Sequence, residues 1–223
     1  MPLIVIEGLD GSGKATNAAL LADYLTKNGH TVKKITFPVY DSDSSAPVRM
    51  YLSGQFGKKP GDVNAYAASA LYAVDRFASY RTDWKTDLES GAWVIADRYT
   101  TSNAVHQASK LAGAERDSYL EWLYDFEFDK IGLPRPDAVI YLDVPPAVSQ
   151  KLIEGRYAGD NSKKDIHEQD VQYLEHCRTA AIYAADKLGW HKIPLTTNGV
   201  MDSREQNLQK IVDVLKGIYG DKF

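Results

Sequence analysis

Cysteine is almost missing from this 223-residue chain, in which Cys177 is the only one. A single thiol cannot form an internal disulfide bond, so an apolar core must stabilise the fold, as in proteins of reducing compartments. The sequence also lacks an apolar stretch long enough to cross a bilayer. It enters a strand-like run directly, rather than a basic and apolar leader. We therefore expect a cytoplasmic protein with no membrane partner.

An excess of positive charge is missing as well. The 26 Lys and Arg residues are outnumbered by 30 Asp and Glu residues, giving a formal net charge of −4. Proteins that coat nucleic acids usually carry a basic face, so the composition argues against a nucleic-acid partner. A small anionic substrate in a local basic pocket is still compatible with this charge. Because repeats and low-complexity linkers are absent too, we expect one domain over residues 1–223.

Short apolar runs alternate with amphipathic helical patterns along the chain. The runs predict strands at 3–7, 31–37, 93–96, 138–142 and 190–195, and the patterns predict helices at 14–27, 63–89, 165–188 and 203–219. Such alternation favours right-handed crossovers and a five-stranded, mostly parallel sheet with helices on both faces, a three-layer α/β/α fold. Ligands of these sheets bind at the carboxyl ends of the strands, so the residues that follow each strand are the candidates for a site.

A glycine-rich turn follows the first strand and reads GLDGSGKAT from Gly8 to Thr16. A strand, a glycine-rich turn, a lysine and a helix in this order are typical of a P-loop, whose backbone N–H groups hold phosphate. Lys14 would reach the outer phosphates of a nucleoside triphosphate. The motif requires Ser or Thr after the lysine to hold Mg²⁺, but this chain has Ala15, and Thr16 comes one position late. The motif thus predicts a phosphate site and leaves its metal contact open.

Asp97 and Arg98 directly follow the third predicted strand. A carboxylate at the end of a strand beside a P-loop strand is where an acid associated with Mg²⁺ is expected. Arginine can hold a phosphate through its planar fork of donors. The alternative is that the two residues cap the next helix and form an ion pair.

Three further side chains allow two interpretations each. Tyr72 and Arg76 are four residues apart and share a helical face, so they could stack on a base and bind its edge. They could equally form a cation–π pair at the border of the core. Asp10, inside the glycine-rich turn, could act on a ligand or only bond its own backbone.

A polar segment at residues 154–164, EGRYAGDNSKK, precedes the third predicted helix. Its cations are Arg156, Lys163 and Lys164. We expect a flap that closes over phosphates, because excluding water strengthens such contacts. A solvated loop between two helices is the alternative.

Several motifs, in order along nearly the whole chain, resemble those of thymidylate kinases, which belong to the P-loop nucleoside monophosphate kinases. They are GLDGSGK, Phe37-Pro38, Leu71-Tyr72 with Asp75-Arg76, DRYTTSNAVHQ from Asp97 to Gln107, and GLPRPD from Gly132 to Asp137. The last two are the most specific. The resemblance implies a homodimer that transfers the γ-phosphoryl group of ATP to dTMP, with Mg²⁺ as cofactor.

The resemblance also implies roles for individual residues. ATP would be bound by Gly8, Leu9, Asp10, Gly11, Ser12, Gly13, Lys14, Ala15, Thr16 and Arg156. dTMP would be bound by Phe37, Arg49, Tyr72, Arg76, Arg98, Ser102, Asn103, His106 and Gln107. Catalysis would depend on Lys14, Asp10, Arg98 and Arg156, and Asp97 would hold the metal directly or through a water molecule. Tyr72 would stack on thymine, and Arg76 would bind the edge of the base.

Three positions depart from the family pattern. Besides Ala15, Tyr40 stands where an arginine often follows the Phe-Pro pair, which leaves Arg49 as the nearest arginine downstream. His106 stands where a tyrosine often precedes Gln107. These departures keep two alternatives open, another nucleotide or deoxynucleoside kinase on the same scaffold, or a catalytically weak nucleotide-binding module. Asn198-Gly199, after the last strand, is either an adenine contact or a plain turn.

Overall fold

A computed structural model describes residues 2–156 and 171–223, and five of its strands form one sheet. They are β1 (Leu3–Gly8), β2 (Val32–Thr36), β3 (Trp93–Asp97), β4 (Ala138–Asp143) and β5 (His191–Pro194). The strand order is β2-β3-β1-β4-β5, and every pair of neighbours is parallel. The predicted α/β fold is confirmed, with each strand end within two residues of its expected position.

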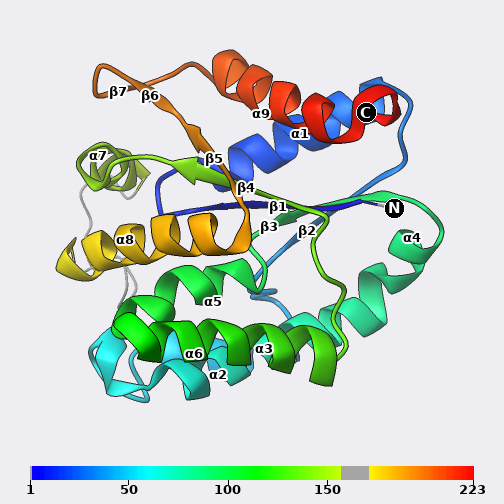
Figure 1. Cartoon of the computed structure of the whole chain (residues 1–223). Coiled ribbons are helices and arrows are strands. Elements are labelled where there is room, and N and C mark those ends of the chain that lie inside the picture. Colours follow the sequence, from blue (N-terminus) through cyan, green and yellow to red (C-terminus); the bar gives the residue numbers. More distant parts are fainter. Residues whose placement is uncertain (1, 157–170) are drawn as a thin grey trace.

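Helices cover both faces of this sheet (Figure 1). They are α1 (Lys14–Lys27), α2 (Ala46–Leu52), α3 (Ala65–Ser79), α4 (Lys85–Glu89), α5 (Thr101–His106), α6 (Gly113–Tyr124), α7 (Pro146–Arg156), α8 (Val171–Leu188) and α9 (Arg204–Tyr219). Two π-helical segments, η3 (Tyr80–Trp84) and η5 (Asp125–Lys130), continue α3 and α6. No helix in the described part of the chain is both long and apolar enough to span a bilayer.

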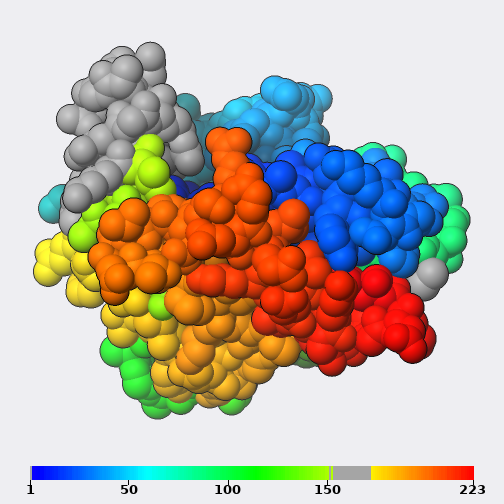
Figure 2. All heavy atoms as spheres, turned by 90° about the horizontal axis from the view of Figure 1, so that it is seen from above, coloured from blue at the N-terminus to red at the C-terminus, as the bar shows by residue number. Residues whose placement is uncertain are grey.

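The alternating side chains of β1 serve two separate apolar cores. Ile4 and Ile6 pack in the core beneath α1 and α9, which lie side by side in Figure 1 and, as blue and red surfaces, in Figure 2. Leu3 and Val5 point to the opposite core, which includes Cys177 of α8. A strand buried on both faces needs apolar residues on both, which is why the central strands β1, β3 and β4 are mostly apolar, whereas the edge strands β2 and β5 carry lysines.

Local sequence signals explain where several elements begin and end. α1 covers the predicted range, and Gly29 follows its C-cap with a φ of 88°. The side chains of Ser203 and Gln206 form a capping box at the start of α9. The predicted helix at 63–89 is one continuous run of α3, η3 and α4. The four predicted helix ranges do not include α2, α5, α6 or α7.

A short antiparallel hairpin follows β5. Its strands are β6 (Thr196–Thr197) and β7 (Val200–Met201), joined by the Asn198-Gly199 turn. Both turn residues have positive φ, 52° and 76°, as a two-residue type I′ turn requires. The dipeptide is therefore a tight turn, and its contact with adenine stays a prediction. Most of the expected flap at 154–164 lies outside the described residues.

Candidate active site

A cavity of about 530 Å³ lies at the carboxyl end of the sheet. Its wall combines the loop after β1, the residues after β2 and β3, and side chains of α3 and α5. Most predicted site residues line it: Asp10, Gly11, Gly13, Lys14, Ala15, Thr16, Phe37, Tyr72, Arg76, Asp97, Arg98, Ser102, Asn103, His106 and Gln107. The strand ends therefore bring together residues that are up to 97 positions apart, Asp10 and Gln107 being the outermost.

Some predicted residues lie elsewhere. Gly8, Leu9 and Ser12 belong to the same turn but are buried and do not line the cavity. Arg49 was expected to reach the acceptor, but its Nη1 donates to the carbonyl oxygens of Tyr40 (2.6 Å) and Ser42 (2.8 Å). These bonds hold Arg49 against the loop after β2, outside the cavity wall. Tyr40 itself lines the cavity and is 53% exposed.

The side chain of Arg156, the last residue of α7, lies outside the described part of the structure, and so do Lys163 and Lys164.

The loop between β1 and α1 has the backbone of a phosphate cradle. Gly11 and Gly13 have φ values of 77° and 84°, which favour glycine. Gly8 is required for a different reason, because a Cβ there would lie 2.5 Å from the Ser12 hydroxyl oxygen. α1 begins at Lys14, so its free N–H groups and the positive end of its dipole face the loop.

The ammonium group of Lys14 is buried in this loop. Its Nζ donates to the carbonyl oxygen of Leu9 at 2.8 Å and lies 3.7 Å from an Asp10 carboxylate oxygen. Burial, together with the nearby Arg98 guanidinium, lowers the pKa of Lys14 to about 8, against the opposing effect of Asp10 and other carboxylates. The buried ammonium group is therefore less stable than an exposed one, and a negatively charged ligand beside it would stabilise it.

Asp10 and Arg98 form an ion pair across the cavity, from Arg98 Nη2 to Asp10 Oδ1. Arg98 Nη1 also lies 3.4 Å from Nε2 of His106. Burial acts to lower the pKa of Arg98, but the carboxylates of Asp10, Glu7 and Asp97 outweigh it and raise the pKa above the usual range. Its φ of 69° is uncommon for a residue with a side chain and costs roughly 1–3 kcal/mol. Arg98 thus pairs with the loop aspartate rather than with the adjacent Asp97.

Asp97 has a different environment. Its Oδ1 is buried and has no hydrogen-bond partner among the described residues, although the residue lines the cavity. A buried carboxylate oxygen without a partner is costly, so it is a natural position for a ligand, a water molecule or an ion.

Aromatic side chains form another part of the wall. The Tyr72 ring meets the Tyr51 ring edge-on, with centroids 6.3 Å apart. Phe37 packs against Tyr99 at 5.9 Å. Because Phe37 and Tyr72 both line the cavity, a planar ligand would find aromatic surface there.

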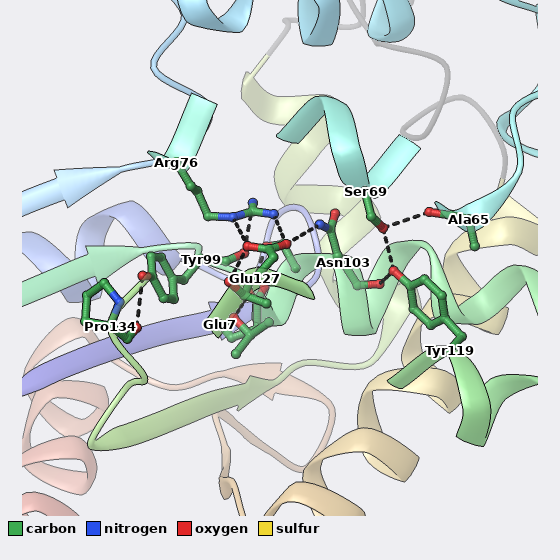
Figure 3. Close-up of polar contacts among 12 residues, drawn as sticks. Glu7, Ala65, Ser69, Arg76, Tyr99, Asn103, Tyr119, Glu127 and Pro134 are labelled. Atoms are coloured by element: carbon green, nitrogen blue, oxygen red, sulfur yellow. Dashed lines mark hydrogen bonds and ion pairs between the residues drawn. The ribbon is translucent and has the colours of Figure 1, made fainter. Parts of the chain in front are cut away.

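Two buried carboxylates support the site, and sequence reasoning missed both. Glu7 of β1 accepts hydrogen bonds from the hydroxyls of Thr101 (2.6 Å) and Ser102 (2.8 Å) at the start of α5. Glu127 of η5 accepts from Arg76 through Nε (2.7 Å) and Nη2 (2.5 Å), as Figure 3 shows. Both glutamates are fully buried. The sequence did carry a signal for each of them. Glu7 is a charged residue at the end of an apolar strand, and Glu127 lies between two phenylalanines, so both could have been recognised as buried carboxylates.

The family described as Thymidylate kinase matches residues 6–206. The chain belongs to the thymidylate kinase family. The thymidylate kinase of Mycobacterium tuberculosis is 32% identical over 184 residues, which are 82% of this chain and 84% of that relative. The probable thymidylate kinase of Staphylothermus marinus is 31% identical over 209 residues, covering 94% and 93%.

A solved thymidylate kinase structure, from Candida albicans, has the same fold with a TM-score of 0.71. It is 20% identical in sequence, and the match covers 97% of this chain and 92% of the other. The resemblance of the motifs and the predicted fold are thereby confirmed. The departures from the thymidylate kinase pattern at Ala15, Tyr40 and His106 all lie on the cavity wall.

Proposed function

We propose that this chain transfers the γ-phosphoryl group of ATP to dTMP, forming ADP and dTDP. Membership of the thymidylate kinase family supports this reaction. The observation that carries the proposal is one continuous cavity, in which a P-loop meets a pocket with aromatic and hydrogen-bonding walls. Two nucleotides that react by direct transfer must share such a space.

The loop side suits the donor. Its backbone N–H groups and the start of α1 favour phosphate, and Lys14 supplies a buried positive charge. The other side suits the acceptor. Arg98 would hold the acceptor phosphate beside Asp10, while Tyr72 and Phe37 contact the base. Phosphoryl transfer needs in-line placement and positive charge more than covalent help from the protein, and both are available here.

The residues present also fit a magnesium ion that is bound mainly by phosphates and water. The described residues contain no cluster of three or more His, Cys, Asp or Glu side chains that could hold a metal. They do offer the unpartnered Oδ1 of Asp97, and Thr16 places a hydroxyl-bearing residue on the wall next to Ala15. Mg²⁺ typically uses one or two carboxylates and keeps several waters. When bound, the ion would neutralise charge on the phosphates.

Arg156 is the proposed flap cation that contacts the moving phosphoryl group. Replacement by alanine should then reduce turnover far more than it weakens dTMP binding. Steady-state rates and equilibrium binding of dTMP check this, and equal turnover in the variant would contradict the assignment.

A second copy of the chain is the proposed partner. On α3, Tyr66, Val74 and Phe77 are 40%, 55% and 43% exposed. Apolar side chains that gather on one exposed helix are typical of an interface. We expect a cytoplasmic homodimer, with no nucleic-acid or membrane partner. Light scattering should give twice the 24.8 kDa mass of one chain, and a Val74→Glu variant should shift toward the monomer.

An acceptor-dependent ADP assay tests the reaction. The purified protein is given Mg²⁺ and ATP, with dTMP, dUMP, dGMP, thymidine or no acceptor, and ADP release is coupled to a colour change. We expect multiple turnovers with dTMP. ATP binding without acceptor-dependent turnover would instead indicate a nucleotide-binding module. Preference for dGMP would overturn the assignment of the pocket, and preference for thymidine would indicate a nucleoside kinase.

A further inference from the structure

Glu127 lies behind the wall of the cavity rather than in it. It belongs to η5, is fully buried and does not line the cavity. Its carboxylate accepts four hydrogen bonds, two from Arg76, one from the Thr100 hydroxyl (2.7 Å) and one from the Asn103 amide (3.2 Å). Arg76 and Asn103 both line the cavity. One hidden carboxylate therefore orients two side chains that a ligand would meet (Figure 3).

The pairing fixes which edge of Arg76 is used. Nε and Nη2 bond the two carboxylate oxygens of Glu127 side by side, which sets the plane of the guanidinium. Nη1 is on the other edge, where its contact with the Tyr99 carbonyl oxygen is long at 3.5 Å. Arginine has only donors, so the edge left to the cavity offers N–H groups.

The same carboxylate fixes the orientation of Asn103. An ionised carboxylate only accepts hydrogen bonds, so the amide must turn its NH₂ group toward Glu127. The amide oxygen then points the other way, as Figure 3 shows. Asn103 thus offers an acceptor to the cavity, beside the donors of Arg76.

A donor beside an acceptor matches the edge of a keto pyrimidine. Thymine and uracil present a C4 carbonyl next to the N3–H group, whereas cytosine presents an amino group next to an unprotonated N3, the reverse pattern. The wrong base would leave buried polar groups unpaired, which is costly. We propose that Glu127 is a specificity-determining positioning residue, which selects keto over amino pyrimidine monophosphates by orienting Arg76 and Asn103. This inference rests on the proposed function.

Glu127→Gln tests the inference. Glutamine has nearly the same shape, but it can donate as well as accept, so the Asn103 amide is free to turn over. The kcat/KM ratio of dTMP to dCMP should fall by about tenfold or more, as expected when a site loses a hydrogen-bond pattern. The ratio of dTMP to dUMP should stay unchanged, because the two bases share the same edge. Glu7→Gln is the matched control, since Glu7 is equally buried but bonds Thr101 and Ser102, and it should leave both ratios unchanged.

The outcomes separate the inference from the proposed function. A wild-type protein that does not phosphorylate dTMP contradicts the proposed function. A wild-type protein that does, with an unchanged dTMP to dCMP ratio in Glu127→Gln, overturns the role of Glu127 and leaves the function intact. A uniform loss with all three substrates also overturns it, because that is the result of a purely structural role.

A second measurement needs no variant and protects the test against misfolding. N3-methyl-dTMP keeps the C4 carbonyl but cannot donate from N3. If Glu127 holds the Asn103 oxygen toward the base, the wild-type protein should use this analogue at least about tenfold less efficiently than dTMP. Equal use of the two nucleotides would overturn the inference.

Discussion

Binding of ATP should draw a proton onto Lys14. In the free protein, burial and the Arg98 guanidinium lower the pKa of Lys14 to about 8. A lowered lysine pKa means that the folded protein holds this proton less tightly than an exposed lysine does. Phosphate oxygens placed against Nζ have the opposite effect, because negative charge favours the ammonium form. The pKa of Lys14 should therefore rise on binding, and the protein should take up protons.

The expected uptake follows from the fraction of neutral lysine before binding. With a pKa of about 8, that fraction is about 0.1 at pH 7, about 0.5 at pH 8 and about 0.9 at pH 9. If Lys14 is fully charged in the complex, these fractions are the number of protons taken up. The phosphates of ATP add little at the two higher values, because phosphate monoesters are ionised well below pH 8.

Calorimetry in pairs of buffers with different ionisation enthalpies measures this uptake. A non-hydrolysable ATP analogue with Mg²⁺ serves as ligand, without dTMP. Lys14→Arg is the matched variant, because a guanidinium stays charged throughout this range. Subtracting the uptake of this variant from the wild-type uptake cancels the contribution of other groups such as Lys110, whose pKa burial likewise lowers to about 8. Wild-type uptake that stays flat from pH 7 to pH 9 would refute the reasoning about Lys14.

Three further predictions concern stability, metal use and thiol reactivity. Gly8→Ala should lower the free energy of unfolding by about 1–3 kcal/mol, because its Cβ would lie 2.5 Å from Ser12 Oγ. Gly217→Ala, which meets open space in α9, should not lower it, and urea denaturation compares the two. Ala15→Ser should reduce the Mg²⁺ concentration needed for half-maximal rate. Identical titration curves for the two proteins would contradict a role of a hydroxyl at this position in holding the metal. Cys177 is fully buried, and burial raises its pKa to about 12, so a thiol reagent at pH 8 should label it only after unfolding; rapid labelling of the native protein would contradict this.

The parallel sheet was predictable because its signals are local. The central strands β1, β3 and β4 are short, mostly apolar runs. α1 has its apolar positions spaced along one face, so its predicted bounds match the structure. α5 has six residues, too few to show a helical period. α6 has its buried residues Tyr119, Leu120 and Leu123 only in its second half, after the polar first half GAERDS, so its apolar stripe is too short to indicate a helix.

The site was predictable only where its chemistry is written in neighbouring residues. The P-loop is such a case, since nine consecutive residues carry the cradle and the lysine. Arg76 is the opposite case. Its spacing from Tyr72 suggested a partner on the same helix, but its charge is balanced by Glu127, 51 residues away. The pairing of Arg98 with Asp10 spans 88 residues. Such pairs depend on how separate elements pack, which no local pattern records.

The hydrogen bonds of Glu7 have a consequence for recombination between related kinases. They join β1, which leads into the P-loop, to hydroxyls 94 and 95 residues later at the start of α5. In a chimera that receives residues 3–16 without residues 97–107, Glu7 Oε1 would keep the Gly8 N–H, but the buried Oε2 would have no assured donor, which is costly. The donor loop and the acceptor helix would therefore have to be exchanged together, as one inherited unit.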